Sequence, residues 1–124
     1  MKIFKFGGAS VKDVESVKNV SSILKLYPGE PLVVVVSAMA KTTNALEKVV
    51  KSYCSGSGEA GALLNEVRSF HVQLMEQLFP DANAEVYTKV NNYFVEMEWV
   101  LEEEPREYDF VYDQIVSFGE LIST

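Results

Sequence analysis

The sequence predicts an α/β fold that begins with a strand, a helix and a second, parallel strand. Residues 2–6 (KIFKF) are short, apolar and aromatic, and Gly7-Gly8 follow them directly. Residues 32–36 (LVVVV) form a continuous, mostly β-branched run, which is typical of a strand buried on both faces of a parallel sheet. Between the two runs, apolar residues recur at helical spacing. For such a βαβ unit a right-handed crossover is expected.

The helix between the strands is defined by its apolar face and by a clear stop signal. Its apolar residues are separated by three or four positions, which places them on one side of a helix; they are Val11, Val14, Val17, Val20 and Leu24. Pro28-Gly29 follow, and these two residue types end helices.

Helical periodicity dominates the chain after the second strand. Leu46 and Tyr53 belong to the apolar face of the next helix, for which Thr42 or Thr43 is the expected N-cap. Similar faces predict three further helices, and the stretch SGSGEAG is a loop before the first of them. Their apolar residues span 63–78, where Pro80 follows, then 86–101 and 110–122.

Composition and charge restrict the classes of protein to which the chain can belong. The 124 residues are 48% hydrophobic and 23% charged, which is typical of a globular domain. The net charge is −7, so the surface repels phosphate backbones and we expect no nucleic-acid partner. No apolar run approaches the ~20 residues of a membrane helix, and we expect no membrane partner. The single cysteine, Cys54, cannot form an intrachain disulfide, which fits a reducing cytoplasm.

Two features predict that the 124 residues are part of a larger α/β domain. Only two strands are evident, whereas typical sheets contain ~4–6. The sequence also stops at GELIST while its last helical pattern continues, without a Gly, Asn or Pro stop signal. The alternative is a small α-rich domain with a frayed end.

The two loops that follow the predicted strands are the candidate ligand site. In parallel α/β sheets, ligands bind beyond the carboxyl ends of the strands, where GGAS and SAMAKTTN both lie. Gly7 and Gly8 would let the backbone adopt positive φ and approach a ligand closely. Their N–H groups at a helix start, with Lys5 nearby, suit a phosphate. A plain strand-to-helix turn explains the same spacing.

Other motifs give weaker indications of function. The pattern G-x-G-x-x-G occurs at Gly56, Gly58 and Gly61, but it follows a helix rather than a strand, so a helix–helix loop is the better interpretation. The acidic run at 102–104 indicates a solvated helix end. We interpret Cys54 as a buried, inert thiol and the lone His71 as a packed histidine.

Three motifs in order resemble the aspartokinases of the amino-acid kinase superfamily. They are KFGGAS after the first strand, VVVVSAMAKTTNAL, and SFGELIST at the end of the sequence. The resemblance extends over the whole chain and is strongest at 3–14, 33–46 and 113–124. It implies a three-layer sandwich of parallel strands flanked by helices, of which residues 1–124 are the N-terminal, helix-rich portion. Family members are longer, so the rest of the kinase domain and the regulatory ACT domains are absent here.

The resemblance implies transfer of the ATP γ-phosphoryl group to the β-carboxylate of L-aspartate. The product is 4-phospho-L-aspartate, formed at the first step toward lysine, threonine and methionine. Lys5 matches the catalytic lysine that stabilises the transferring group, and Gly7, Gly8 and Ser10 match phosphate-binding positions. Ala9 departs from the family, in which Thr or Ser is common, and this removes one hydroxyl.

The resemblance also implies substrate contacts and partners. Ser37 matches a serine near the reacting groups, and Thr43 and Glu120 match aspartate-binding positions, with Glu120 suited to the α-ammonium. The implied ligands are ATP, with Mg²⁺ carried by its phosphates, and L-aspartate; no residue is assigned to a metal. The parent is expected to be a cytoplasmic homo-oligomer, and the 124 residues alone are expected to be inactive.

Two alternatives stay open at this point. One is another amino-acid kinase superfamily enzyme, acting on glutamate, carbamate or a nucleotide. The other is a non-catalytic binding module with the same fold.

Overall fold

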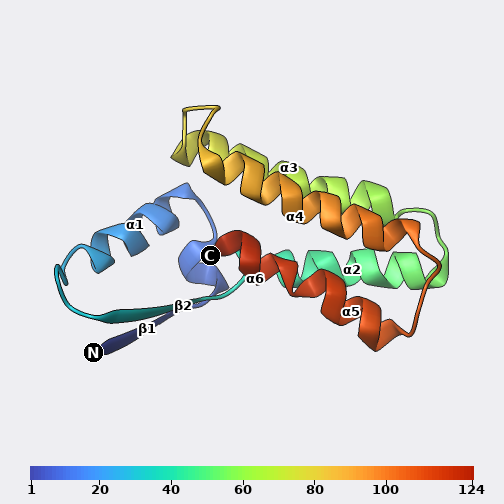
Figure 1. Cartoon of the computed structure of the whole chain (residues 1–124), viewed down its shortest axis with the longest axis horizontal. Coiled ribbons are helices and arrows are strands. Elements are labelled where there is room, and N and C mark those ends of the chain that lie inside the picture. The colour runs from blue at the N-terminus through green and yellow to red at the C-terminus, as the bar shows by residue number, and fades with distance from the viewer.

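The computed structural model describes residues 1–124, which form two unlike halves (Figure 1). One half contains two strands and the helix between them. The other half is a stack of helices, in which α3 and α4 run side by side over α2 and α5. None of the helices combines the length and the apolarity that crossing a membrane requires.

The predicted βαβ unit is confirmed. Strands β1 (Lys2–Phe6) and β2 (Leu32–Val36) pair in parallel, with a register that runs from Lys2 opposite Leu32 to Phe6 opposite Val36. Helix α1 (Val14–Leu24) connects them. A short 3₁₀ helix, η1 (Gly8–Val11), precedes α1 and takes up the first turn of the periodic pattern.

Helix α1 begins at a capping aspartate. The Asp13 carboxylate accepts a hydrogen bond of 2.8 Å from the Ser16 N–H, which satisfies one of the free donors of the first turn. This backbone hydrogen bond holds the pKa of Asp13 below its usual value. The cap fixes where the chain turns after η1.

The sheet is covered on one face and bare on the other. Helix α1 packs against the face that carries Phe6 and Val36, where Val11, Met39 and Leu74 form a small buried cluster. Ile3, Val33 and Val35 lie on the opposite face and are 67%, 42% and 46% exposed. The prediction that the second strand is buried on both faces is therefore wrong for this chain, because a helix covers only one face.

The remaining helices follow the predicted periodicity closely, with two corrections. Their bounds are α2 (Thr42–Ser55), α3 (Ala60–Leu78), α4 (Glu85–Glu102), α5 (Tyr108–Val116) and α6 (Phe118–Ser123). The predicted threonine caps are wrong, because the N-cap of α2 is Lys41 and makes no side-chain hydrogen bond. The predicted last helix is divided at Ser117, whose hydroxyl donates to the Asp113 carbonyl, a helix acceptor.

The main hydrophobic core lies in the helical half. Eleven buried residues from α2, α3, α4 and α5 form one cluster, in which Leu46, Phe94, Met97 and Ile115 have no exposed surface. The predicted packing of His71 is confirmed, since this side chain is 2% exposed and its Nδ1 lies 2.8 Å from the Val67 carbonyl oxygen. Burial lowers the pKa of His71. Cys54 is half-buried rather than buried and packs at the edge of this core.

Candidate functional site

The two loops that follow β1 and β2 lie against each other, as the parallel pairing predicts. The Ser37 N–H donates to the Phe6 carbonyl at 2.9 Å, and the Ala40 N–H donates to the Gly8 carbonyl at 3.1 Å. Ala40 has a φ of 49°, in the left-handed region that non-glycine residues seldom occupy. The second loop is thus bent sharply back onto the first.

Gly8 is required by this contact rather than by its own backbone angles. Gly7 is extended, with a φ of −74° and a ψ of 172°, and Gly8 does not have a positive φ either. The expectation of positive φ at these glycines is wrong. A Cβ at Gly8 would lie 2.8 Å from the Ala40 carbonyl oxygen and 3.0 Å from that of Ala38. Gly8 therefore makes room for the backbone of the second loop.

Lys5 and Gly7 provide the positive groups near the first loop. Lys5 lies opposite Val35 in the register, so it belongs to the bare face of the sheet. Its side chain is exposed and takes part in none of the ion pairs of the chain. Gly7 is exposed, a Cβ there would have nothing within 4 Å, and its N–H has no backbone acceptor. These groups are free to meet an anion.

Ser10 lies in a different hollow from Thr43 and Glu120. It is exposed on η1, and its N–H donates to the Gly7 carbonyl at 2.9 Å. It lines a hollow of about 500 Å³ together with residues of α1 and of the turn before it, including Lys12 and Asp13. The structure therefore places Ser10 with α1, not with the predicted substrate residues.

Thr43 and Glu120 come together although they are far apart in the sequence. Both are exposed, and they line the same hollow of about 340 Å³, between the start of α2 and the helices α5 and α6. Tyr112, Asp113 and Ser117 complete this lining with Val116. The carboxylates of Asp113 and Glu120 give the hollow a negative charge, which suits an ammonium group.

Sequence reasoning missed Tyr112, Asp113 and Ser117. The signal for them was their spacing from Glu120, since positions three, seven and eight residues before it share its helix face. Although α5 and α6 are separate helices, residues of both still line the same hollow.

Ser37 connects the second loop to the last helix. Its side-chain hydroxyl makes no hydrogen bond within the chain, and the residue is half-buried. Its carbonyl accepts a hydrogen bond of 2.6 Å from the Ser123 hydroxyl on α6. In Figure 1 the C-terminal end of α6 accordingly lies beside the first loop and the end of β2.

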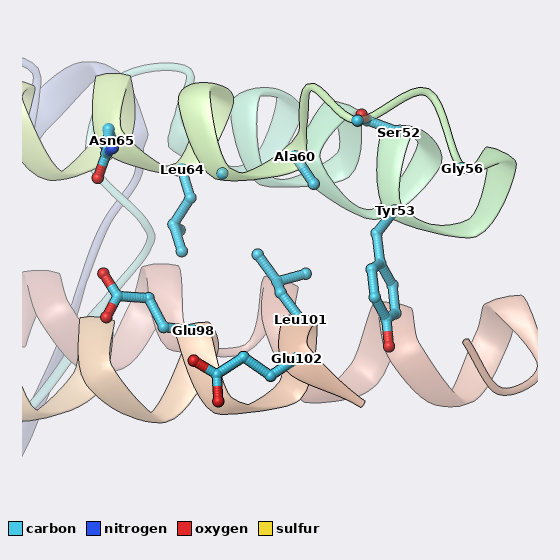
Figure 2. A pocket seen from close by; sticks show the side chains of 11 residues that line it. Ser52, Tyr53, Gly56, Ala60, Leu64, Asn65, Glu98, Leu101 and Glu102 are labelled. Atoms are coloured by element: carbon cyan, nitrogen blue, oxygen red, sulfur yellow. The ribbon is translucent and has the colours of Figure 1, made fainter. Parts of the chain in front are cut away.

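A third hollow, shown in Figure 2, is lined in part by the glycine pattern at 56–61. It has a volume of about 460 Å³ and lies between the α2–α3 loop and α4. The predicted helix–helix loop is confirmed, with Gly56 ending α2 at a φ of 70°. Glu98 and Glu102 line the facing side, and their carboxylates would repel a pyrophosphate. This cavity does not fit a dinucleotide.

Comparison with known proteins gives a consistent family assignment. The profile described as "Amino acid kinase family" matches residues 1–124. Aspartokinase 1, chloroplastic, of Arabidopsis thaliana is 33% identical over an alignment of 129 residues, which covers 98% of this chain and 22% of that protein. The aspartokinase of Chlamydia trachomatis is 26% identical, with 98% and 26% covered. The chain thus spans about a quarter or less of the length of these relatives.

Solved structures agree with the sequence relatives. Escherichia coli aspartokinase III in complex with lysine and aspartate superimposes with a TM-score of 0.81 at 25% identity, over 99% of this chain and 27% of that chain. The same enzyme in complex with aspartate and ADP gives the same values. The helix-rich α/β fold with parallel strands is therefore the fold of these kinases.

Proposed function

The chain belongs to the amino acid kinase family, and on this premise we propose that residues 1–124 are the N-terminal portion of the catalytic domain of an aspartokinase. The relatives at 33% and 32% identity are aspartokinases, which supports aspartate over other acceptors. The observation that carries the proposal is the shared hollow of Thr43 and Glu120, at the start of α2 where the second loop ends. The bare sheet face at Ile3, Val33 and Val35 supports a further layer supplied by the rest of such a domain.

The proposed reaction transfers the γ-phosphoryl group of ATP to the β-carboxylate of L-aspartate. A bond forms between a carboxylate oxygen and the γ-phosphorus, the bond from this phosphorus to the bridging oxygen breaks, and ADP leaves. A model aspartate side chain has a pKa of ~3.9, so the nucleophile is already ionised at neutral pH. No general base is required, and catalysis consists of positioning and charge stabilisation.

The free groups of the first loop fit the phosphates. In the proposal, Lys5 stabilises the charge on the transferring phosphoryl group, and Gly7, Gly8 and Ser10 belong to the phosphate-binding segment. The exposed, unpaired Lys5 and the free N–H of Gly7 support this role. In the proposal, Mg²⁺ is carried by the ATP phosphates and enters the site as part of the substrate.

The second loop and α6 are assigned to aspartate. Glu120, with Asp113 beside it, would attract the α-ammonium group, and Thr43 would donate a hydroxyl hydrogen bond to the substrate. Ser37, whose hydroxyl is unpaired, would contact the reacting groups. Aspartate, ATP and a homo-oligomeric parent stay predictions for the longer protein. So do the place at the first step toward lysine, threonine and methionine and the cytoplasmic location, since the Arabidopsis relatives are chloroplastic.

A hydroxylamine trap tests the proposal. The full-length protein that carries this chain is incubated with Mg·ATP and either aspartate or glutamate, and the acyl phosphate is captured as its hydroxamate. We expect hydroxamate with aspartate only, and none from the 124 residues alone. Hydroxamate with glutamate would favour another kinase of the superfamily. A folded protein that gives none with either acid would favour the binding module.

Replacing Lys5 provides a sharper control. Lys5→Ala should lower turnover by a factor of about 10² or more, because one preorganised charge at the transition state is removed. Lys25→Ala, which removes an exposed lysine at the far end of α1, should leave turnover unchanged. Equal turnover in both variants would remove Lys5 from the reaction.

A further inference from the structure

Helix α6 is attached to the second loop by a single hydrogen bond between distant residues. The Ser123 hydroxyl lies 2.6 Å from the Ser37 carbonyl oxygen and 3.3 Å from the Glu120 carbonyl oxygen. A hydroxyl has one proton to donate, and the shorter contact is the stronger hydrogen bond. The Ser123 proton is therefore donated to Ser37, and this hydrogen bond joins α6 to the second loop. Along the chain, these two segments are separated by helices α2 to α5.

A second contact lies four residues earlier on the same face of α6. Gly119 is buried, and a Cβ there would lie 3.2 Å from the Ala38 Cβ, 3.3 Å from the Leu46 Cδ1 and 3.4 Å from the Thr42 Cγ2. Positions i and i+4 share one side of a helix. Gly119 and Ser123 thus hold this side of α6 against the second loop and the start of α2.

Glu120 lies between these two attachment points. Its partner in the hollow, Thr43, directly follows Thr42, which Gly119 approaches. The distance between Glu120 and Thr43 is therefore determined by how closely α6 is held to the second loop. Sites that bind small substrates lose affinity when their side chains are displaced by about 1 Å.

We propose that Ser123 is a positioning residue for the acceptor-substrate site. Its hydroxyl, acting through the Ser37 carbonyl, fixes the second loop against α6 and so holds Glu120 at its distance from Thr43. Ser123 does not touch the substrate itself. The effect of Ser123 on the aspartate KM rests on the proposed function. Its effect on how firmly the second loop is held to α6 does not.

The kinetic test uses three variants of the full-length protein. Ser123→Ala removes the hydroxyl and should raise the KM for aspartate about three- to tenfold, which corresponds to one lost hydrogen bond. The KM for ATP should change by less than about twofold, because the first loop is untouched. Ser123→Thr keeps a hydroxyl and should restore the aspartate KM. Thr124→Ala is the matched control, since its hydroxyl donates to Glu120 within α6 only.

A mechanical test runs on the same proteins without requiring activity. Amide hydrogen exchange of the peptide that covers residues 37–42 should become faster in Ser123→Ala and stay unchanged in Thr124→Ala. Unchanged exchange in Ser123→Ala would overturn the attachment. Faster exchange with an unchanged aspartate KM would overturn the role in substrate positioning. A wild-type protein that forms no acyl phosphate would overturn the proposed function and the kinetic role with it, while the exchange data still decide the attachment.

Discussion

The two halves of the molecule are similarly apolar in sequence but differ sharply in how much of that apolar surface they bury. In the helical half, Leu46, Phe94, Met97 and Ile115 have no exposed surface. In the half formed by β1, α1 and β2, helix α1 contains no buried residue, and Phe6 is the only buried residue of either strand.

The difference follows from the number of layers that each half contains. Four helices packed together can bury one face each against their neighbours. A parallel sheet has two apolar faces and needs a layer on each, but α1 supplies only one. The helical half therefore carries most of the stability of this chain, while the strand half carries the loops proposed to bind phosphate.

Truncating one core residue in each half should give the largest contrast. Phe94→Ala should lower the free energy of unfolding by about 3–5 kcal/mol, because it opens a cavity in a fully buried site. Ile23→Ala, on half-buried α1, should cost about 1 kcal/mol. Urea unfolding of the 124-residue chain measures both. Equal losses would mean that the two halves are equally stabilised by packing.

A methyl group added where the halves meet tests how tightly the two loops are packed. Gly8→Ala should cost about 1–3 kcal/mol, because its Cβ would collide with the Ala40 carbonyl at 2.8 Å. Gly7→Ala is the matched control and should be neutral or stabilising by up to about 1 kcal/mol, since it has open space and an ordinary φ. Urea titration of both variants measures the change in the free energy of unfolding. Similar values for both variants would show that the loops do not pack as described.

Acidification should weaken the helical half before the other. Burial lowers the pKa of His71 in the folded protein below its ordinary 6.5, so the unfolded chain binds the proton more readily. Stability is therefore complete above pH 6.5 and falls as the pH drops below it, by up to about 1.4 kcal/mol per pH unit. His71→Leu should remove this slope. Thermal unfolding between pH 5 and 8 measures it, and an unaltered slope in the variant would exclude His71 as its source.

Removing an exposed ion pair in the strand half should have the smallest effect. Lys2 lies 2.6 Å from the Glu30 carboxylate and over the Tyr27 ring, with about half of its side chain exposed. Lys2→Ala should cost about 0.2–1 kcal/mol, because exposed pairs contribute little. Lys18→Ala, which breaks no ion pair, gives the baseline in the same urea titration. If Lys2→Ala lowered the free energy of unfolding by more than Ile23→Ala does, the exposed ion pair would contribute more than apolar packing in this half, contrary to the prediction.

Local patterns were sufficient to predict the helices and strands. The spacing of apolar residues located both strands and the bodies of the helices, because periodicity depends on neighbours in the sequence. It did not indicate that Lys41 would precede α2, or that Ser117 would divide the last helix, because the spacing of apolar residues carries no information about helix caps or about hydroxyl groups that bond to the backbone. Burial of the second strand on both faces was predicted wrongly. Its run of valines shows that both faces are apolar, but it does not show whether this chain contains a layer that covers each face.

The candidate site was predictable only in part. Parallel pairing placed GGAS and SAMAKTTN at one edge of the sheet, and the structure confirms that arrangement. The reason for Gly8 was not accessible, because the atom it makes room for, the Ala40 carbonyl oxygen, comes from the other loop. The attachment of Ser123 to Ser37 was missed for a similar reason, since no local pattern links two such distant serines.

The distance between these two serines along the chain also matters while the protein is being made. Ser37 and Ser123 are separated by 86 residues. At a synthesis rate of about 5–20 residues per second, Ser37 is joined to the growing chain roughly 4–17 s before Ser123. During that interval the second loop can already bond to the first loop through Ala40 and Gly8, whereas its attachment to α6 has to wait for Ser123. We therefore expect the substrate hollow to be the last part of this chain to take shape on the ribosome.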